Sequence, residues 1–149
     1  MDGDLRRAAV VALVGLGRSP DSRDRAAAGQ ALAAFAELPR AGAVLLDLVL
    51  DAEDTFVTRT TTEALLRRHD RAGLAVVASA LAVADDGHGD WIGTAVHDVF
   101  GIFAVERDAA LRRCEELSRK DDDRLVRGAR ALHELLTDLD PVLHPVPRA

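Results

Sequence analysis

Hydrophobic residues recur along the chain at intervals of three and four positions, a spacing typical of helices that pack through one face. Residues suited to turns and helix starts separate segments of about 12 to 17 residues. The pattern predicts an all-α fold. The expected helices cover residues 4–16, 21–38, 41–50, 55–69, 72–84, 91–105, 108–119 and 123–138.

Acidic residues mark the expected helix starts. Asp21 follows Pro20, and Asp54, Asp90 and the run 121–123 stand before other periodic segments. Such side chains accept hydrogen bonds from free backbone N–H groups and favour the positive end of a helix. Residues 141–149 contain three prolines, which cannot continue a helix. We therefore expect one domain over residues 1–140 and a proline-rich tail, extended or mobile, over 141–149.

The expected helices repeat in pairs. Leu32, Leu65, Phe100 and Leu132 each lie near the middle of a helix that follows an acidic corner, at spacings of 33, 35 and 32 residues. The other four helices open on an arginine that is followed ten residues later by a leucine; these pairs are Arg6 and Leu16, Arg40 and Leu50, Arg71 and Leu81, and Arg107 and Leu117. Two registers with one period predict four repeats, at about 4–38, 39–70, 71–105 and 106–138.

This pattern resembles HEAT repeats, especially the short bacterial HEAT-like type, in which an acidic corner precedes V-R, two small residues and A-L. Asp54, Val57, Arg59, Ala64 and Leu65 carry the nearest match, and the resemblance covers residues 4–138. It implies a right-handed α-solenoid, armadillo-like, of about four antiparallel helix pairs. It also implies that the second helix of each pair lines the concave side. The third repeat lacks the arginine, and the ankyrin and tetratricopeptide signatures are absent.

The stretch VVALVGLGRS contains Gly15 and Gly17 after an apolar run, as a dinucleotide-binding turn would. That fingerprint needs a third glycine where Pro20 stands, and a strand before the turn. The sequence instead favours a corner between two packed helices. Gly17 is expected just past the helix end in a left-handed conformation.

Composition narrows the class of protein. The 149 residues suit one domain, and the single cysteine, Cys114, excludes an internal disulfide. A net charge of −6 and 3% aromatic residues disfavour nucleic acid as a partner. Apolar runs are shorter than the roughly 20 residues that cross a bilayer. We expect a cytoplasmic chain that binds neither nucleic acid nor membrane.

Candidate chemistry is sparse. Cys114 shares a helix face with Leu111 and Leu117, which favours packing over nucleophilic catalysis. The run DDGHGD at 85–90 lacks the alternating ligands and closing glutamate of a calcium-binding loop. No convergent catalytic set is visible, so we expect no enzyme activity, no cofactor and no metal.

Two surfaces are candidates for binding a partner. The concave column is the polar face expected opposite the buried face of the second helices, and it consists of Gln30, Arg59, Glu63, Arg67, Thr94, Asp98, Arg130 and His133. The acidic ridge is the edge formed by the acidic corners, and it consists of Asp54, Asp85, Asp86, Asp90 and Asp122. Repeated helix capping also explains the ridge.

The leading hypothesis is a non-enzymatic protein–protein interaction module, an adaptor or scaffold that holds a protein partner on its concave face. An immunity or antitoxin-like protein that neutralises a toxin is the first alternative. The resemblance also admits an enzyme, because some HEAT-like proteins are DNA glycosylases or bilin lyases. A glycosylase would need a basic groove, and this chain is acidic.

Overall fold

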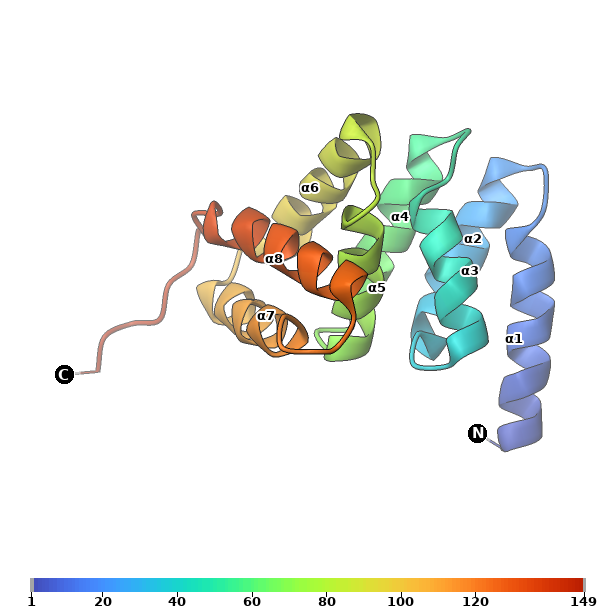
Figure 1. Cartoon of the computed structure of the whole chain (residues 1–149), viewed down its shortest axis with the longest axis horizontal. Coiled ribbons are helices and arrows are strands. Elements are labelled where there is room, and N and C mark those ends of the chain that lie inside the picture. Colours follow the sequence, from blue (N-terminus) through green and yellow to red (C-terminus); the bar gives the residue numbers. More distant parts are fainter. Residues whose placement is uncertain (1, 149) are drawn as a thin grey trace.

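The fold is all-α, as the hydrophobic pattern predicts. The computed structural model describes residues 2–148; the first residue of the expected domain and the last residue of the expected tail lie outside this range. Within it there are eight α-helices, one short 3-10 helix and no β-strand (Figure 1). The helices are α1 (Gly3–Gly17), α2 (Ser22–Leu32), α3 (Pro39–Val49), α4 (Thr55–Leu66), α5 (Arg71–Leu81), α6 (Asp86–Phe100), α7 (Ala104–Leu117) and α8 (Asp123–Thr137), with the 3-10 helix η1 (Ala33–Phe35) after α2.

Most of the helices form two rows. Helix α4 packs between α2 and α6, and α3 packs between α1 and α5 (Figure 1). The residues that align in the expected repeats face the interior, because Leu32, Leu65, Phe100 and Leu132 are all buried. The periodic apolar positions therefore supply the core between the rows.

Helix α8 does not extend the row of α2, α4 and α6, where the sequence placed it. It packs most extensively against α5 and α7, and only slightly against α6 (Figure 1). The reason is a close backbone crossing. Gly128 in α8 lies so near the carbonyl oxygen of Ala78 in α5 that a side chain there would collide with it. Small residues on both helices allow this approach.

Several helix boundaries differ from the expected ones. Helix α6 begins at Asp86 rather than near Asp90, because Asp85 accepts a hydrogen bond from the backbone N–H of His88 at 2.7 Å and caps the helix. Helix α2 ends early, and a 3-10 turn leads to Pro39, which opens α3. Proline suits the first turn of a helix because its missing N–H needs no partner there.

The tail fixes the corner between α6 and α7. The backbone N–H of Leu143 donates to the carbonyl of Ile102 at 2.7 Å, and Ala104 N–H donates to the carbonyl of Leu143 at 2.9 Å. These bonds form an isolated parallel bridge between Phe103 and Leu143. The tail is extended, as its prolines predict. Its hydrogen bonds hold residues 101–103 outside α6, although the sequence analysis expected this helix to continue to residue 105.

The glycines at the end of α1 lie in a corner between helices. Gly17 is the last residue of α1, and no glycine in residues 2–148 has a positive φ. The expected left-handed conformation is therefore wrong. Gly17 is buried instead, and a Cβ on it would lie 3.4 Å from Cγ1 of Val44 in α3. A small residue suits this position because α1 and α3 pack closely here.

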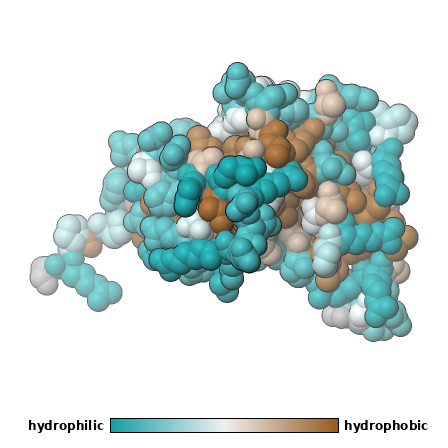
Figure 2. All heavy atoms as spheres, viewed as in Figure 1, coloured by the Kyte–Doolittle hydropathy of each residue, from teal (hydrophilic) through white to brown (hydrophobic). Residues whose placement is uncertain are grey.

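The surface combines polar and apolar areas. Figure 2 shows apolar atoms along the groove between α3 and α5, beside the mainly hydrophilic surface of α8. This groove has a volume of about 720 Å³ and is lined by residues that include Gly42, Leu46, Val76 and Leu125. No helix within residues 2–148 is long and apolar enough to cross a membrane.

The crossing of α5 and α8 is testable with a glycine pair. We expect Gly128→Ala to lower the free energy of unfolding by about 1 to 3 kcal/mol, because the added methyl group overpacks the contact with Ala78. The control is Gly93→Ala in α6, where the new Cβ would meet only Leu135 at 3.8 Å. This change should be neutral or stabilise by up to about 1 kcal/mol, because alanine favours helix. Urea unfolding measures both, and equal effects would contradict the close crossing.

Candidate functional site

The centre of the expected concave column is held together by one arginine. Arg59 in α4 contacts Glu63 one turn later, with 3.0 Å between Nε and Oε1, and contacts Asp98 in α6, with 3.0 Å between Nη2 and Oδ2. All three side chains remain partly exposed. The structure thus brings three column residues together across the α4–α6 contact.

The other column residues are more dispersed. Gln30 on α2 and Arg67 at the C-cap of α4 are exposed, and within residues 2–148 neither side chain makes a hydrogen bond or ion pair. The Thr94 hydroxyl donates to the carbonyl of Asp90 at 3.0 Å, and Thr94 lines a hollow between α6 and α8.

Arg130 and His133 belong to a different part of the surface. Both are on α8 and line a hollow of about 410 Å³ between α7 and α8. His133 Nε2 lies 3.4 Å from Oε1 of Glu115 in α7. Because α8 packs on α5 rather than extending the row of α6, these two residues do not continue the column that Arg59 and Asp98 form.

Sequence reasoning missed Phe56, which adds an aromatic ring to the same helix face. Phe56 is 54% exposed, although it is one of the chain's few aromatic residues. Glu63 in α4 and Arg67, the C-cap residue of α4, follow it by seven and eleven positions, so all three lie on one side of the helix. The sequence could have revealed Phe56, because it is a large apolar residue at a position on the polar face of the helix. We name Phe56, Arg59, Glu63 and Arg67 the α4 stripe.

The acidic ridge residues serve mainly as helix caps. Asp54 accepts from Phe56 N–H at 2.9 Å, and Asp122 accepts from Leu125 N–H at 3.1 Å, while Asp85 caps α6. Asp86 and Asp90 lie exposed within α6. Asp122 lines the groove between α3 and α5, away from the α3–α4 and α5–α6 corners that hold the others (Figure 1). Asp122 is therefore separated from the other residues of the acidic ridge.

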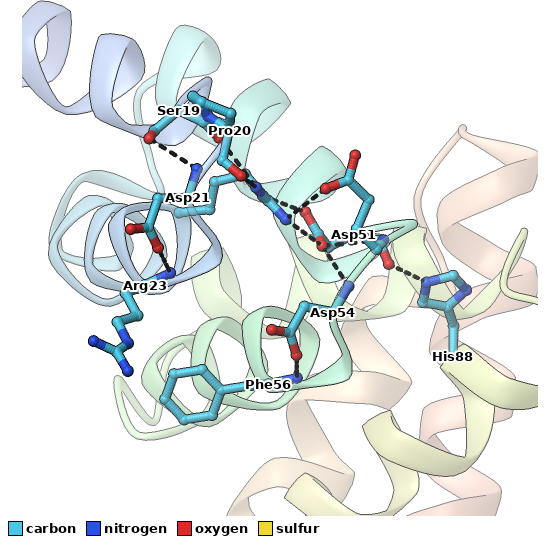
Figure 3. Close-up of polar contacts among 10 residues, drawn as sticks. Ser19, Pro20, Asp21, Arg23, Asp51, Asp54, Phe56 and His88 are labelled. Carbon is cyan, nitrogen blue, oxygen red and sulfur yellow. Dashed lines mark hydrogen bonds and ion pairs between the residues drawn. The ribbon is translucent and has the colours of Figure 1, made fainter.

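The most elaborate polar contact is a buried ion pair that the sequence analysis did not single out. Arg25 in α2 and Asp51 after α3 have side chains only 9% and 10% exposed. They form a two-pronged pair, with 2.9 Å from Nε to Oδ1 and 3.1 Å from Nη2 to Oδ2 (Figure 3). Arg25 Nη1 also donates to the carbonyls of Ser19 and Pro20, both at 3.0 Å. The pair thus joins the α1–α2 corner to the α3–α4 corner.

Asp51 stays ionised in this setting. Burial by itself would raise the pKa of its carboxyl group, but hydrogen bonds from Arg25 and from the N–H of Asp54 outweigh burial and lower that pKa below its usual value. The signal in the sequence was periodicity: Arg25 shares a face with Ala28, Gly29 and Leu32, which are buried. An arginine on such a face needs a carboxylate partner.

His88 adds the α5–α6 corner to this cluster. Its Nε2 lies 2.8 Å from the carbonyl oxygen of Asp51, and its Nδ1 lies 2.8 Å from Oδ1 of Asp85 (Figure 3). Both neighbours are acceptors, so the ring satisfies both only when each nitrogen carries a proton. The bond to the Asp51 carbonyl, helped by Asp85, raises the pKa of His88 above its usual value although partial burial opposes this.

The one cysteine side chain, Cys114, is buried. Burial raises the pKa of the Cys114 thiol to about 12, so the thiol is protonated near neutral pH. Within residues 2–148, no group of three or more histidine, cysteine, aspartate or glutamate side chains is placed to hold a metal ion. The polar groups described above mostly bind one another, whereas Phe56 and Arg67 of the α4 stripe are exposed.

The buried pair predicts a sharp contrast between two acidic residues that contact the same arginine. We expect Asp51→Asn to lower the free energy of unfolding by about 3 to 5 kcal/mol, because Arg25 keeps its charge in a buried place without a counter-charge. Glu53→Gln should cost less than about 1 kcal/mol, because Glu53 is 76% exposed and contacts Arg25 from outside at 3.4 Å. Denaturant unfolding at neutral pH compares them; similar losses would contradict the assigned burial.

The His88 contacts predict how stability depends on pH. A histidine whose pKa is raised by folding stabilises the fold fully below its unfolded value of 6.5, and that contribution is lost as pH rises through the folded value. The melting temperature should therefore fall more between about pH 6 and pH 9 in the natural chain than in His88→Gln. His97→Gln, which removes an exposed ring, is the control and should keep the natural pH dependence. Parallel curves for all three chains would refute the double hydrogen bond of His88.

Comparisons with known proteins do not assign this chain to a family. No protein-family model matches it, and the search of curated proteins found no match. The resemblance to HEAT repeats therefore remains an interpretation of the sequence.

Proposed function

We propose that this chain is a HEAT-like α-solenoid that works as a protein–protein interaction module, and that its partner binds on the side of α2, α4 and α6. The arrangement of rows supports the solenoid, since α4 packs between α2 and α6 while α3 packs between α1 and α5. The Arg25–Asp51 pair supports it as well, because it links one helix pair to the next. Rows of this kind present extended binding surfaces.

The observation that carries the proposal is the α4 stripe on the central helix of that row. Phe56 is 54% exposed, and Arg67 is exposed without a side-chain partner in residues 2–148. Aromatic residues, phenylalanine among them, and arginine are enriched at the buried cores of protein interfaces. They lie at opposite ends of a stripe that is long enough to contact a helix or a folded surface.

The middle of the stripe supports the proposal in a different way. Arg59 is held by Glu63 and Asp98, so its position is fixed before a partner arrives. A surface that is already ordered loses less entropy on binding. The complementary partner is a protein surface with an apolar pocket for the Phe56 ring and an acidic group for Arg67.

The same geometry gives no support to an enzyme. An active site needs a nucleophile, acid or base that converges with stabilising groups in one cavity. The ion pairs of Arg59 lie on the outer surface, and the protonated Cys114 thiol is buried. The groups of the α4 stripe are arranged as a contact surface.

The proposal is tested by photo-crosslinking in the cells that produce the chain. A photoreactive phenylalanine analogue is placed at Phe56, or at Phe103 as a matched control that is 48% exposed at another corner. We expect a discrete protein adduct from position 56 that the added change Arg67→Glu abolishes. Phe56→Ala should then weaken binding of the purified partner by about thirtyfold or more, as for an interface hot spot.

Two results would refute this assignment. One is an adduct from position 103 and none from position 56. The other is an adduct from position 56 that persists unchanged with Arg67→Glu. Thermal unfolding of each variant provides the check on folding, and exposed substitutions of this kind should change stability by no more than about 0.5 kcal/mol.

A further inference from the structure

A groove with an apolar floor runs between α6 and α8, which contact each other only slightly (Figure 1). It consists of two hollows of about 450 and 380 Å³ that share Asp90, Leu135 and Asp138, so they are continuous. The residues of the floor are all partly buried; they are Leu81, Ala84, Ala131, Leu135 and Leu139. Covering such a floor removes apolar area from water, which is favourable. We name this depression the α6–α8 groove.

Both rims of the α6–α8 groove are acidic. Asp86 and Asp90 lie on the α6 side, and Glu134 and Asp138 lie on the α8 side. All four residues are exposed, and none of their carboxylates pairs with a basic side chain within residues 2–148. Lysine and arginine are absent from the two sequence segments that line the groove, residues 72–106 and 131–147. The groove therefore lacks the cations that would balance its rims.

The α8 rim places its charges against the usual preference of a helix. The C-terminal end of a helix carries partial negative charge, so cations are favoured there and carboxylates are not. Glu134 lies in the last turn of α8 and Asp138 is its C-cap, and that turn has no basic residue. Arg107 binds backbone carbonyls at this end, but its ion pair is with Asp108. A cation supplied from outside the chain relieves this repulsion.

Two glycines keep the groove open on the α6 side. Gly89 and Gly93 are one turn apart, and each lines one of the two hollows. A Cβ on Gly89 would contact no neighbouring element within 4 Å, and one on Gly93 would meet only Leu135, at 3.8 Å. Packing inside the described chain therefore requires glycine at neither position, although glycine destabilises a helix relative to alanine. The missing side chains leave room for another element to approach α6.

We propose that the α6–α8 groove binds a basic amphipathic helix of a partner protein. The apolar stripe of that helix lies on the floor, and its lysine or arginine side chains reach the carboxylates of both rims. Helix-in-groove recognition of this kind is a recurring mode of peptide binding. A depression lined by one sign of charge also attracts an oppositely charged segment from a distance. No residue of the α4 stripe lines this groove, so the proposal does not depend on the partner of that stripe.

A synthetic helical peptide tests the proposal on the whole chain. The probe has about 15 residues, to match the length of α6, with leucine on one face and lysine on both flanks. The fluorescence anisotropy of a dye on the peptide measures its dissociation constant. We expect saturable binding that weakens as salt is added, and no binding of a peptide with glutamate in place of each lysine. A natural chain that does not bind the lysine peptide, or that binds both peptides equally, overturns the proposal.

A pair of neutralising substitutions locates the charge that binds the probe. Glu134→Gln together with Asp138→Asn should weaken binding by roughly three- to tenfold, because two exposed ion pairs with the peptide are lost. The control is Asp47→Asn together with Asp121→Asn, which removes the same charge from exposed residues outside the groove and should leave the dissociation constant nearly unchanged. Equal weakening by the two pairs indicates attraction by net charge alone and overturns the proposal.

A bulky side chain at Gly89 tests whether the probe lies in the groove. Gly89→Leu fills the hollow without altering any charge, so it should abolish binding at peptide concentrations that saturate the natural chain. Gly15→Leu is the control, because a Cβ there also meets nothing within 4 Å but lies on α1. Circular dichroism checks that each variant keeps its helices. Normal binding by Gly89→Leu overturns the proposal, as does a second copy of the chain that occupies the groove in sedimentation velocity and excludes the probe.

Discussion

The buried contact between Arg25 and Asp51 is the interaction on which the order of the helices depends. Taking two charges out of water is costly, and attraction between them offsets the cost only where the geometry is good and the other polar atoms find partners. Here Arg25 also donates to the carbonyls of two residues in its own corner, while Asp51 accepts from the backbone of the next corner. Each charge is thus bound to a different corner, and together they fix the distance between two helix pairs. If the two corners packed in a different alignment, Arg25 and Asp51 would not meet, and each charge would be buried without its partner.

Other arginines repeat this arrangement with backbone carbonyls as acceptors. Arg68 donates to the carbonyl of Ala33 at 2.7 Å and contacts Glu37 and Asp70, which ties the end of α4 to the segments around it. Arg107 donates to the carbonyl of Leu139 at 2.8 Å. Ala33 and Leu139 lie just past the ends of α2 and α8, so each arginine fastens the chain after a helix end to a neighbouring element through charge-assisted hydrogen bonds. The chain has one lysine among its basic residues, and the planar, multiply donating guanidinium group suits this task better than an ammonium group.

The sequence predicted the parts of the fold that local chemistry determines. The buried positions of Leu32, Leu65, Phe100 and Leu132 follow from periodicity, and the caps at Asp54 and Asp122 follow from residue type. It placed the start of α6 near Asp90, although Asp85 is an equally good cap by residue type. The ring of His88, held by a distant corner, selects Asp85. The position of α8 was also out of reach, because the contact of Gly128 with Ala78 joins segments far apart in the chain. For the candidate site, the sequence analysis placed Arg59, Glu63 and Asp98 in one column, and in the structure these residues contact one another. Arg130 and His133 lie on a different surface, because α8 packs elsewhere than expected.

The distribution of satisfied and unsatisfied side chains separates the surfaces that build the fold from those that are open to partners. At the corners, carboxylates such as Asp54 and Asp85 already accept backbone hydrogen bonds, so a partner that captured them would have to compete with helix caps. On the α4 stripe, the fixed charge of Arg59 lies between Phe56 and Arg67, whose side chains have no such internal task in residues 2–148. Exposed apolar area gains free energy when it is covered. The corner carboxylates therefore act within the fold, and we propose that the α4 stripe, with its charges and its aromatic ring, is the surface that a different protein contacts.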